Sequence, residues 1–254
     1  MTTSTPEPAK PSVMAEIVDT ARTVAYALLI ALVLRVFLFQ PYTIPSASME
    51  PALLVGDYIV VSKFDYGWSR HSVPFSPPLP HGRLMGRAPE RGDVVVFQLP
   101  RDESVAYIKR VIGLPGDRVQ VIGGVVFVNG RAIPRAPIGP IQDPGDPQVT
   151  VVQERETKPN GQTYTTFDRG SGHEGDDTEV YIVPADHYFV MGDNRDNSLD
   201  SRWPSAIGVG LVPADNLAGK ARFVMLSWRD GASLFKPWTW VTRFQPDRAL
   251  LGIT

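Results

Sequence analysis

One apolar segment constrains this chain more than any other feature of its sequence. Residues 23–39, TVAYALLIALVLRVFLF, are apolar on all faces of a helix except at Arg35, whose long side chain can reach lipid headgroups. Extended back through Ala21, the segment approaches the roughly 20 residues that a membrane-spanning helix needs. We interpret residues 16–39 as a transmembrane anchor. A buried core helix and a cleaved secretory signal are the alternatives.

Charge does little to orient this anchor. The preceding residues carry both signs, at Glu7, Lys10, Glu16, Asp19 and Arg22. Residues 1–15 are rich in Pro and Thr and are predicted to form a disordered tail. Since the other residues follow the anchor and contain no second span, we expect a single-pass protein with its N-terminus inside.

The residues after the anchor have the patterns of antiparallel β-structure. The 24 prolines and 22 glycines suit a turn-rich β protein. Hairpins are predicted at Gly123-Gly124 and Asn129-Gly130, which supply positive φ angles within a meander over 117–133. The Pro-rich stretch 68–90 is predicted to be a surface excursion. Runs of β-branched and aromatic residues predict strands at 56–64, 92–99, 105–112, 179–184, 187–193 and 219–228.

These patterns divide the chain. Residues 40–133 and 179–254 are predicted to form one β-rich domain. Residues 134–178 are richer in Pro, Gly and charge, and we interpret them as a peripheral insertion or a small second lobe with a hairpin about Asn160-Gly161. The predicted fold is mainly antiparallel β, preceded by one N-terminal transmembrane helix.

Charge and cysteine content exclude several functions. A net charge of −2 without a long block of one sign argues against nucleic acid as a partner. The absence of cysteine excludes disulfides, thiolate catalysis and zinc–thiolate sites.

Two serines follow the anchor closely, in IPSASMEP at residues 44–51. Linker composition explains such a segment, but a serine can also act as a nucleophile when a neighbour accepts its proton. A Ser-His-Asp triad is not indicated, because no G-x-S-x-G elbow occurs. Of the four histidines, three lie in loop-like segments: His71, His81 and His173, with His187 as the fourth.

Lys109 is the other candidate proton acceptor, inside the apolar strand VAYIKRVI. Alternation places Val105, Tyr107, Lys109 and Val111 on one face. A buried ammonium must reach solvent, pair with a carboxylate or lose its proton. Lowering the lysine pKa from about 10.4 by ~3 units costs roughly 4 kcal/mol, which burial can supply, and a neutral lysine can serve a serine as general base. An edge-strand lysine or an ion pair is the alternative.

Taken with the anchor, four segments resemble those of type I signal peptidases, in the family's order. They are PSASMEPALLVGDYIVVSKFDYG, RGDVVVFQLP, YIKRVIGLPGD and GDNRDNSLDSR, within 40–130 and 179–225. The resemblance implies an antiparallel catalytic domain of the signal-peptidase/LexA-like type. It also implies a Ser/Lys serine endopeptidase that forms an acyl-enzyme without a cofactor.

By this resemblance Ser48 is the nucleophile and Lys109 the general base and later the general acid. The Ser46 hydroxyl and the Ser48 N–H form the oxyanion hole. Ser198 orients the lysine, and Asp200 with Arg202 forms a supporting ion pair. The substrate-binding residues implied are Tyr42, Ile44, Pro45, Met49, Leu53, Tyr107 and Ile108, lining S1 and S3 pockets for small residues; core packing is the alternative for each.

Calcium binding is an alternative reading of the acidic loop that contains Asp193, Asn194, Asp196, Asn197 and Asp200. The loop lacks a glycine where an EF-hand-like turn requires one, so we expect no metal.

The distance from anchor to nucleophile constrains the substrate. Phe39 and Ser48 are nine residues apart, which span about 30 Å at most. The resemblance implies partners that suit this place: signal peptides of preproteins emerging from the secretion machinery, cut after Ala-x-Ala type sites. It implies a bacterial cytoplasmic (inner) membrane location with the catalytic domain on the outer, periplasmic face, and contact with membrane lipid. The alternatives are a LexA-type self-cleaving protein and a non-enzymatic membrane-tethered β module.

Overall fold

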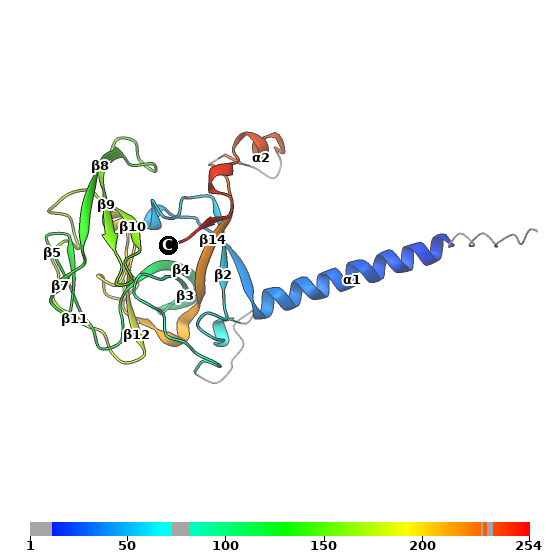
Figure 1. The fold of residues 1–254 in the computed structure, drawn as a ribbon, viewed down its shortest axis with the longest axis horizontal. Helices are drawn as coiled ribbons and strands as arrows, with labels where there is room; N and C mark the ends of the chain where they lie inside the picture. The colour runs from blue at the N-terminus through cyan, green and yellow to red at the C-terminus, as the bar shows by residue number, and fades with distance from the viewer. Residues whose placement is uncertain (1–11, 73–81, 230, 233–235) are drawn as a thin grey trace, which may run out of the picture.

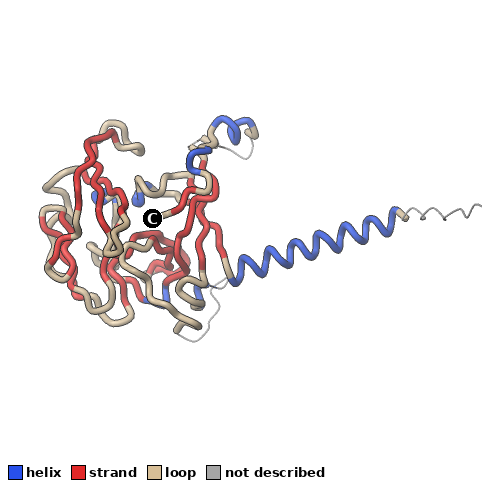
Figure 2. Tube along the Cα trace, viewed as in Figure 1, coloured by secondary structure: helices blue, strands red, loops and turns tan. Residues whose placement is uncertain are grey.

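The computed structural model describes residues 12–72, 82–229, 231–232 and 236–254, and strands form most of its regular structure (Figure 2). A long helix, α1 (Val13–Phe37), projects from a β domain (Figure 1). The mainly antiparallel β fold preceded by an apolar helix is therefore confirmed. The predicted tail over 1–15 lies largely outside the described residues.

Helix α1 begins at Val13, three residues before the predicted anchor, because the Ser12 hydroxyl accepts a hydrogen bond from Ala15 N at 3.3 Å and caps the first turn. None of its residues is buried. Its mean hydropathy reaches 1.8 over an 18-residue window, and it is the one described helix whose length and composition suit a membrane span. These properties are consistent with a membrane protein.

The main sheet is antiparallel and has the order β1-β2-β14-β3-β4-β12-β13, with β15 also paired to β14. The long strands cross its centre, where apolar residues are buried on both sides. The strands are β1 (Phe39–Thr43), β2 (Asp57–Ser62), β3 (Val94–Leu99), β4 (Asp102–Gly113), β12 (His187–Met191), β13 (Val212–Pro213), β14 (Leu217–Ser227) and β15 (Leu251–Gly252).

Two smaller antiparallel sheets lie beside the main one (Figure 1). One has the order β11-β5-β6-β7, from β5 (Arg118–Ile122), β6 (Val125–Val128), β7 (Arg131–Ala132) and β11 (Tyr181–Ile182). The other has the order β10-β9-β8, from β8 (Arg135–Gln142), β9 (Thr150–Thr157) and β10 (Thr163–Asp168). The second sheet falls within the predicted insertion.

The predicted hairpins are confirmed by backbone geometry. Gly123 and Gly124 have φ values of 53° and 75°, and Asn129 and Gly130 have values of 53° and 76°. Short helices connect the remaining strands: η1 (Ala47–Met49), η2 (Arg70–Ser72), η3 (Arg195–Asn197), η4 (Ala214–Asn216), α2 (Trp238–Thr242) and η5 (Pro246–Arg248). Within the Pro-rich excursion, residues 73–81 lie outside the described part of the chain.

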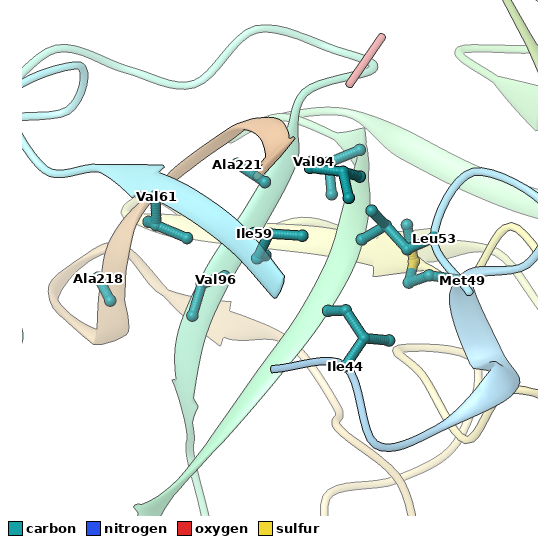
Figure 3. Packing of buried hydrophobic residues seen from close by; sticks show 10 residues of the cluster. Ile44, Met49, Leu53, Ile59, Val61, Val94, Val96, Ala218 and Ala221 are labelled. Atoms are coloured by element: carbon teal, nitrogen blue, oxygen red, sulfur yellow. The ribbon is translucent and has the colours of Figure 1, made fainter. Parts of the chain in front are cut away.

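One buried apolar cluster supports the segment that follows β1. Ile44, Met49 and Leu53 point into it beside Ile59 and Val94 (Figure 3). Their side chains are at most 3% exposed. Burying side chains of this size stabilises the fold by about 1.5–3 kcal/mol each. Because Met49 belongs to η1 and Ile44 and Leu53 flank it, their burial holds the backbone of η1 in place.

Sheet register brings distant segments together at one end of this cluster. Strand β4 pairs with β3 along its length, with Lys109 opposite Val95, and with β12 only at Arg110, Val111 and Gly113. The chain leaves β12 directly into the loop over 192–202. This loop meets η1, where Asn194 N donates to the Ser48 carbonyl at 3.2 Å.

Candidate active site

The structure places a lysine amine against a serine hydroxyl. Lys109 Nζ donates to Ser48 Oγ at 2.6 Å, and also to the Ile108 carbonyl at 3.0 Å. Ser48 lies in η1 and is half-buried, whereas Lys109 lies in β4 and is 3% exposed. These residues are 61 positions apart in the sequence. Strand β4 carries Lys109, and the loop that follows its partner strand β12 contacts η1, which carries Ser48.

Burial is the main cause of an unusual protonation equilibrium at Lys109. It lowers the pKa of the amine to about 8, while Asp200 and Asp193 oppose the shift and Arg202 supports it. Neither carboxylate forms an ion pair with Lys109 among the described residues. A pKa of about 8 leaves roughly a tenth of the amines neutral at pH 7, against about one in a thousand for free lysine.

Ser46 lies on the solvent side of the pair. Its Oγ is 3.4 Å from Ser48 Oγ, and the residue is exposed. It precedes η1 in an extended conformation, with φ −135° and ψ 153°. Two hydroxyls and one amine therefore form a continuous set of contacts, from Ser46 through Ser48 to Lys109.

The loop after β12 supplies a buried ion pair behind the lysine. Arg202 Nε and Nη2 donate to the two carboxylate oxygens of Asp200 at 2.9 and 3.0 Å. Gly192 N donates to the same carboxylate at 3.0 Å. Burial alone would raise the pKa of Asp200, but Arg202 and the Gly192 N–H hold this pKa below its ordinary value.

Ser198 belongs to the same loop, and its hydroxyl is buried. The hydroxyl interacts with the Asp200 carboxylate and helps to lower the pKa of Asp200. Gly192 lies directly against it: a Cβ added at Gly192 would overlap both Ser198 Oγ and the Ser48 carbonyl oxygen. The close approach of the loop to η1 therefore requires glycine at this position.

Sequence reasoning missed several residues that hold this arrangement. Arg110 is fully buried and binds Asp193 bidentately, at 2.7 and 2.6 Å. Arg195 binds Glu156 in the same way, at 2.5 and 2.7 Å, which ties the loop to β9. Such planar pairs resist displacement because two parallel hydrogen bonds fix their geometry. The one signal for Arg110 was a second charge in an apolar strand.

A groove of about 740 Å³ opens beside Ser48 and Lys109. Of the predicted substrate-binding residues, Pro45, Tyr107 and Ile108 line this groove. Ile44, Met49 and Leu53 lie in the buried cluster beneath η1, and Tyr42 packs against that cluster. The groove has further lining residues that sequence reasoning did not identify with substrate: Val105, Ala106, His173, Glu174, Leu199 and Trp203.

Two alternatives to the contact between Lys109 and Ser48 were a histidine base and a metal ion in the acidic loop. No histidine in the described part of the chain hydrogen-bonds Ser48, although His173 lines the groove; His81 lies outside the described residues. In the acidic loop, Asp193 pairs with Arg110 and Asp200 with Arg202. Among the residues that the structure describes, no group of three potential ligands could hold a metal ion.

An antiparallel β domain that presents a serine hydroxyl to a buried lysine amine has the features of a serine endopeptidase. Comparisons with known proteins agree. A family model described as "Signal peptidase, peptidase S26" matches residues 17–228. Proteins named Signal peptidase I from Rickettsia typhi and Rickettsia prowazekii are each 41% identical to this chain over 80% of its length, covering 77% and 78% of their own.

The chain therefore belongs to the signal peptidase family, peptidase S26, and is a serine endopeptidase. This membership supports a signal peptidase I function. A solved structure of a signal peptidase I from Enterococcus faecalis aligns with 53% of this chain and 97% of its own, at 26% identity. The TM-score of that alignment is 0.32, which is too low to support a conclusion.

Proposed function

We propose that this chain is a membrane-bound endopeptidase that removes signal peptides from exported proteins, with Ser48 as nucleophile and Lys109 as general base. The contact of 2.6 Å between Lys109 Nζ and Ser48 Oγ carries the proposal. When the amine is neutral, its lone pair can accept the hydroxyl proton across this contact. The lowered pKa of Lys109 makes the neutral form accessible near neutral pH.

The proposed reaction has two halves. Ser48 Oγ attacks the carbonyl carbon of the scissile bond while Lys109 takes the hydroxyl proton, and the ammonium then gives that proton to the departing amine. An ester to Ser48 remains. Lys109, neutral again, deprotonates a water that attacks the ester, and its proton returns to Ser48 as the acid leaves.

Charge develops on the substrate oxygen in both halves. We assign the Ser46 hydroxyl and the Ser48 N–H as its hydrogen-bond donors. The position of Ser46 Oγ, 3.4 Å from Ser48 Oγ, supports this assignment. So does the place of Ser48 in the first turn of η1, where N–H groups have no intrahelical acceptor. One such donor typically contributes ~3 kcal/mol to the transition state.

We propose that the residues beside Lys109 position its amine and take no part in the reaction themselves. Asp200 and Arg202 are joined at 2.9 Å and hold the loop, and within the loop Ser198 packs directly against Gly192. We propose that the Ser198 hydroxyl directs the Lys109 amine towards Ser48. Two observations support this role: the Ser198 hydroxyl is held by its interaction with Asp200, and Ser198 lines the same groove as Lys109 and Ser48.

The edge of β4 is the proposed substrate platform. Residues 106–108 pair with β3 on one side only, because the contact of β12 with β4 begins at Arg110. An extended peptide can add to this free edge through main-chain hydrogen bonds. Pro45, Tyr107 and Ile108 would then face the side chains before the cleaved bond. Ile44, Met49, Leu53 and Tyr42, packed beneath η1, would limit the depth of the pockets and favour small residues.

The location is proposed from the anchor. Helix α1 is exposed along its length and leads directly into β1, at whose end the nucleophile segment begins. We propose a single pass through the cytoplasmic membrane with the domain on the outer face. Residues 40–133 and 179–254 would form the catalytic domain, with residues 134–178 as an added lobe.

Cleavage by the purified full-length protein tests this proposal. The substrate is a peptide with one Ala-x-Ala site, and the fragments are identified by mass spectrometry. We expect cleavage after the second Ala, lost in Ser48→Ala and in Lys109→Ala. Lys158→Ala is the matched control, because the pKa of Lys158 is also lowered to about 8 by burial, yet its amine does not contact Ser48.

Full activity of Lys109→Ala contradicts the assignment of the base. Cleavage of the chain itself, with the peptide left intact, favours the LexA-type alternative. A protein that never cuts the peptide favours a non-enzymatic module.

A further inference from the structure

The C-terminal end of α1 is held by donors from the β domain. An α-helix leaves its last carbonyls without intrahelical partners. Here the carbonyls of Arg35 and Val36 accept hydrogen bonds from the Lys63 amine, at 3.0 and 3.4 Å. The carbonyl of Phe37 accepts from Trp68 Nε1 at 2.7 Å. These three carbonyls thus find partners in one short segment of the β domain.

All the hydrogen bonds of the Lys63 amine go to backbone carbonyls. Its third acceptor is the carbonyl of Ser72, in η2. Its own N–H donates to the Leu38 carbonyl at 2.9 Å, just past the end of α1. An ammonium has three donors, so all of them are satisfied. Lys63 therefore links the helix end, β2 and η2 at one point.

This arrangement opposes the usual preference of a lysine for solvent. Lys63 is 1% exposed and forms no ion pair with a described residue. Burial, and to a smaller extent Arg35, lowers the pKa of Lys63 to about 8. Carbonyl acceptors and the negative end of the α1 dipole offset the cost of burying the amine. A leucine or methionine would pack here without that cost, so the hydrogen bonds themselves are the feature to explain.

The path from this point to the nucleophile is short and fully paired. Strand β1 begins at Phe39, two residues after α1 ends, and pairs with β2 from Phe39–Ser62 to Thr43–Tyr58 without a register shift. Ser48 follows five residues after Thr43. Lys63 itself directly follows β2. Helix α1, which lies next to β2 in Figure 1, is therefore connected to the nucleophile through one hairpin. Lys63 and Trp68 bind the end of α1 at the open end of this hairpin.

We propose that Lys63 and Trp68 form a rigid joint between anchor and catalytic domain, which holds Ser48 at one height above the bilayer and selects the cleaved bond by its distance from the membrane. This inference rests on the proposed function. A substrate held in the same bilayer meets Ser48 only where its scissile bond lies at that height. A free peptide in detergent can approach from any direction and does not depend on the joint.

Two assays on the full-length protein separate these cases. One uses a soluble Ala-x-Ala peptide in detergent, and the other a signal-peptide-bearing preprotein in the same liposomes as the enzyme. Lys63→Met removes the hydrogen bonds to the Arg35 and Val36 carbonyls, and Trp68→Phe keeps an aromatic ring but removes the donor to the Phe37 carbonyl. Lys158→Met, remote from α1, is the control.

We expect both joint variants to retain the rate on the soluble peptide. On the membrane-held preprotein they should lose about tenfold or more, because misplacing reacting groups by about 1 Å can cost about 100-fold. Cleavage at neighbouring positions should also increase. Equal losses in both assays, or no loss in either, overturn the proposal. Should Lys63→Met fail to fold, Trp68→Phe provides the same comparison.

A distance measurement tests rigidity without activity. Since the chain has no cysteine, Thr23→Cys in α1 and Ile207→Cys on the domain surface can be spin-labelled as a clean pair. The distance distribution should be narrow in the otherwise unaltered protein and broader with Lys63→Met or Trp68→Phe. A distribution that is equally broad in all three overturns the joint. If none of the proteins cuts the soluble peptide, the proposed function fails. The width of the distance distribution between the two labels still shows whether the joint is rigid.

Discussion

Lys109 Nζ lies 2.6 Å from Ser48 Oγ, and this contact distinguishes Lys109 from the other lysines of low pKa. Burial lowers the pKa of Lys63, Lys109 and Lys158 alike, to about 8. Lys63 donates to carbonyls and Lys158 lies at the turn between β9 and β10. A desolvated amine is therefore not sufficient for a base; it must also reach a nucleophile.

Activity should depend on pH through the Lys109 amine. Because the neutral amine is the proposed base, kcat/KM should rise with pH and level off above an apparent pKa of about 8. The measurement is the pH profile of kcat/KM on the soluble peptide. Glu50 also titrates near neutrality, because burial and Asp143 raise its pKa to about 7. Glu50→Gln should leave the rise near pH 8 in place. A profile that rises only above about pH 10 contradicts the assignment.

Removing the Lys109 amine should stabilise the protein at neutral pH. The folded pKa, about 8, lies below the unfolded value of about 10.4, so the unfolded chain binds more protons between these limits. Wild-type stability therefore falls as pH falls from about 10.4 to about 8, and the full cost, on the order of 3 kcal/mol, persists below that.

Lys109→Met should accordingly raise the free energy of unfolding most at pH 7. The loss of the hydrogen bonds of the Lys109 amine reduces this gain, and the gain should vanish above about pH 10.4. Urea titrations of both proteins at several pH values test this. Because Lys63 and Lys158 remain in both, the difference reports Lys109 alone. A difference independent of pH would show that the Lys109 pKa is not lowered by folding.

Sequence patterns predicted the strands well because runs of β-branched residues bounded by Gly or Pro rarely form anything other than strands. The strand predicted at 92–99 is observed over Val94–Leu99, and the one at 105–112 over Asp102–Gly113. The lysine inside the latter was found for the same reason, since one charge in an apolar run is conspicuous. Lys63, at the end of a similar run, was overlooked because its partners are backbone carbonyls, which leave no sequence pattern.

Long-range partners were not predictable for a related reason. Arg110 binds Asp193 across 83 residues, and local patterns carry no information about that pairing. Likewise, an apolar residue beside Ser48 can face the groove or the core. Pro45 lines the groove and Met49 is buried in the apolar cluster, although the two residues flank Ser48 within the same short segment.

Ser46→Ala should impair catalysis without unfolding the protein. Ser46 is exposed, and within the described part of the chain its hydroxyl hydrogen-bonds only Ser48 Oγ, so truncation leaves no buried group unpaired. Loss of one oxyanion donor typically lowers kcat by about 100- to 1000-fold. The measurement is kcat on the soluble peptide, with the melting temperature as a check. Ser205→Ala, another exposed serine, should have no effect. Unchanged kcat in Ser46→Ala would remove Ser46 from the oxyanion hole.

Gly192→Ala should displace the nucleophile. Gly192 has no left-handed φ, so alanine is tolerated by its backbone, but the added Cβ would overlap Ser198 Oγ and the Ser48 carbonyl oxygen. The Ser198 hydroxyl can rotate away, whereas the Ser198 Cβ, at 2.5 Å from the added Cβ, and the Ser48 carbonyl oxygen move only with the backbones of the loop and of η1. We therefore expect a loss of about 100-fold in kcat/KM, the scale of a shift of about 1 Å in reacting groups.

The matched control is Gly252→Ala, because nothing described lies within 4 Å of a Cβ there. Adding Ser198→Ala to Gly192→Ala removes only the overlap with the hydroxyl and leaves those with the Cβ of residue 198 and with the Ser48 carbonyl oxygen, so it should not restore activity. Recovery in that double variant would mean that Ser198, not the Ser48 backbone, transmits the effect. Wild-type activity of Gly192→Ala itself would show that the loop and η1 can separate without cost, and that their close packing does not position Ser48.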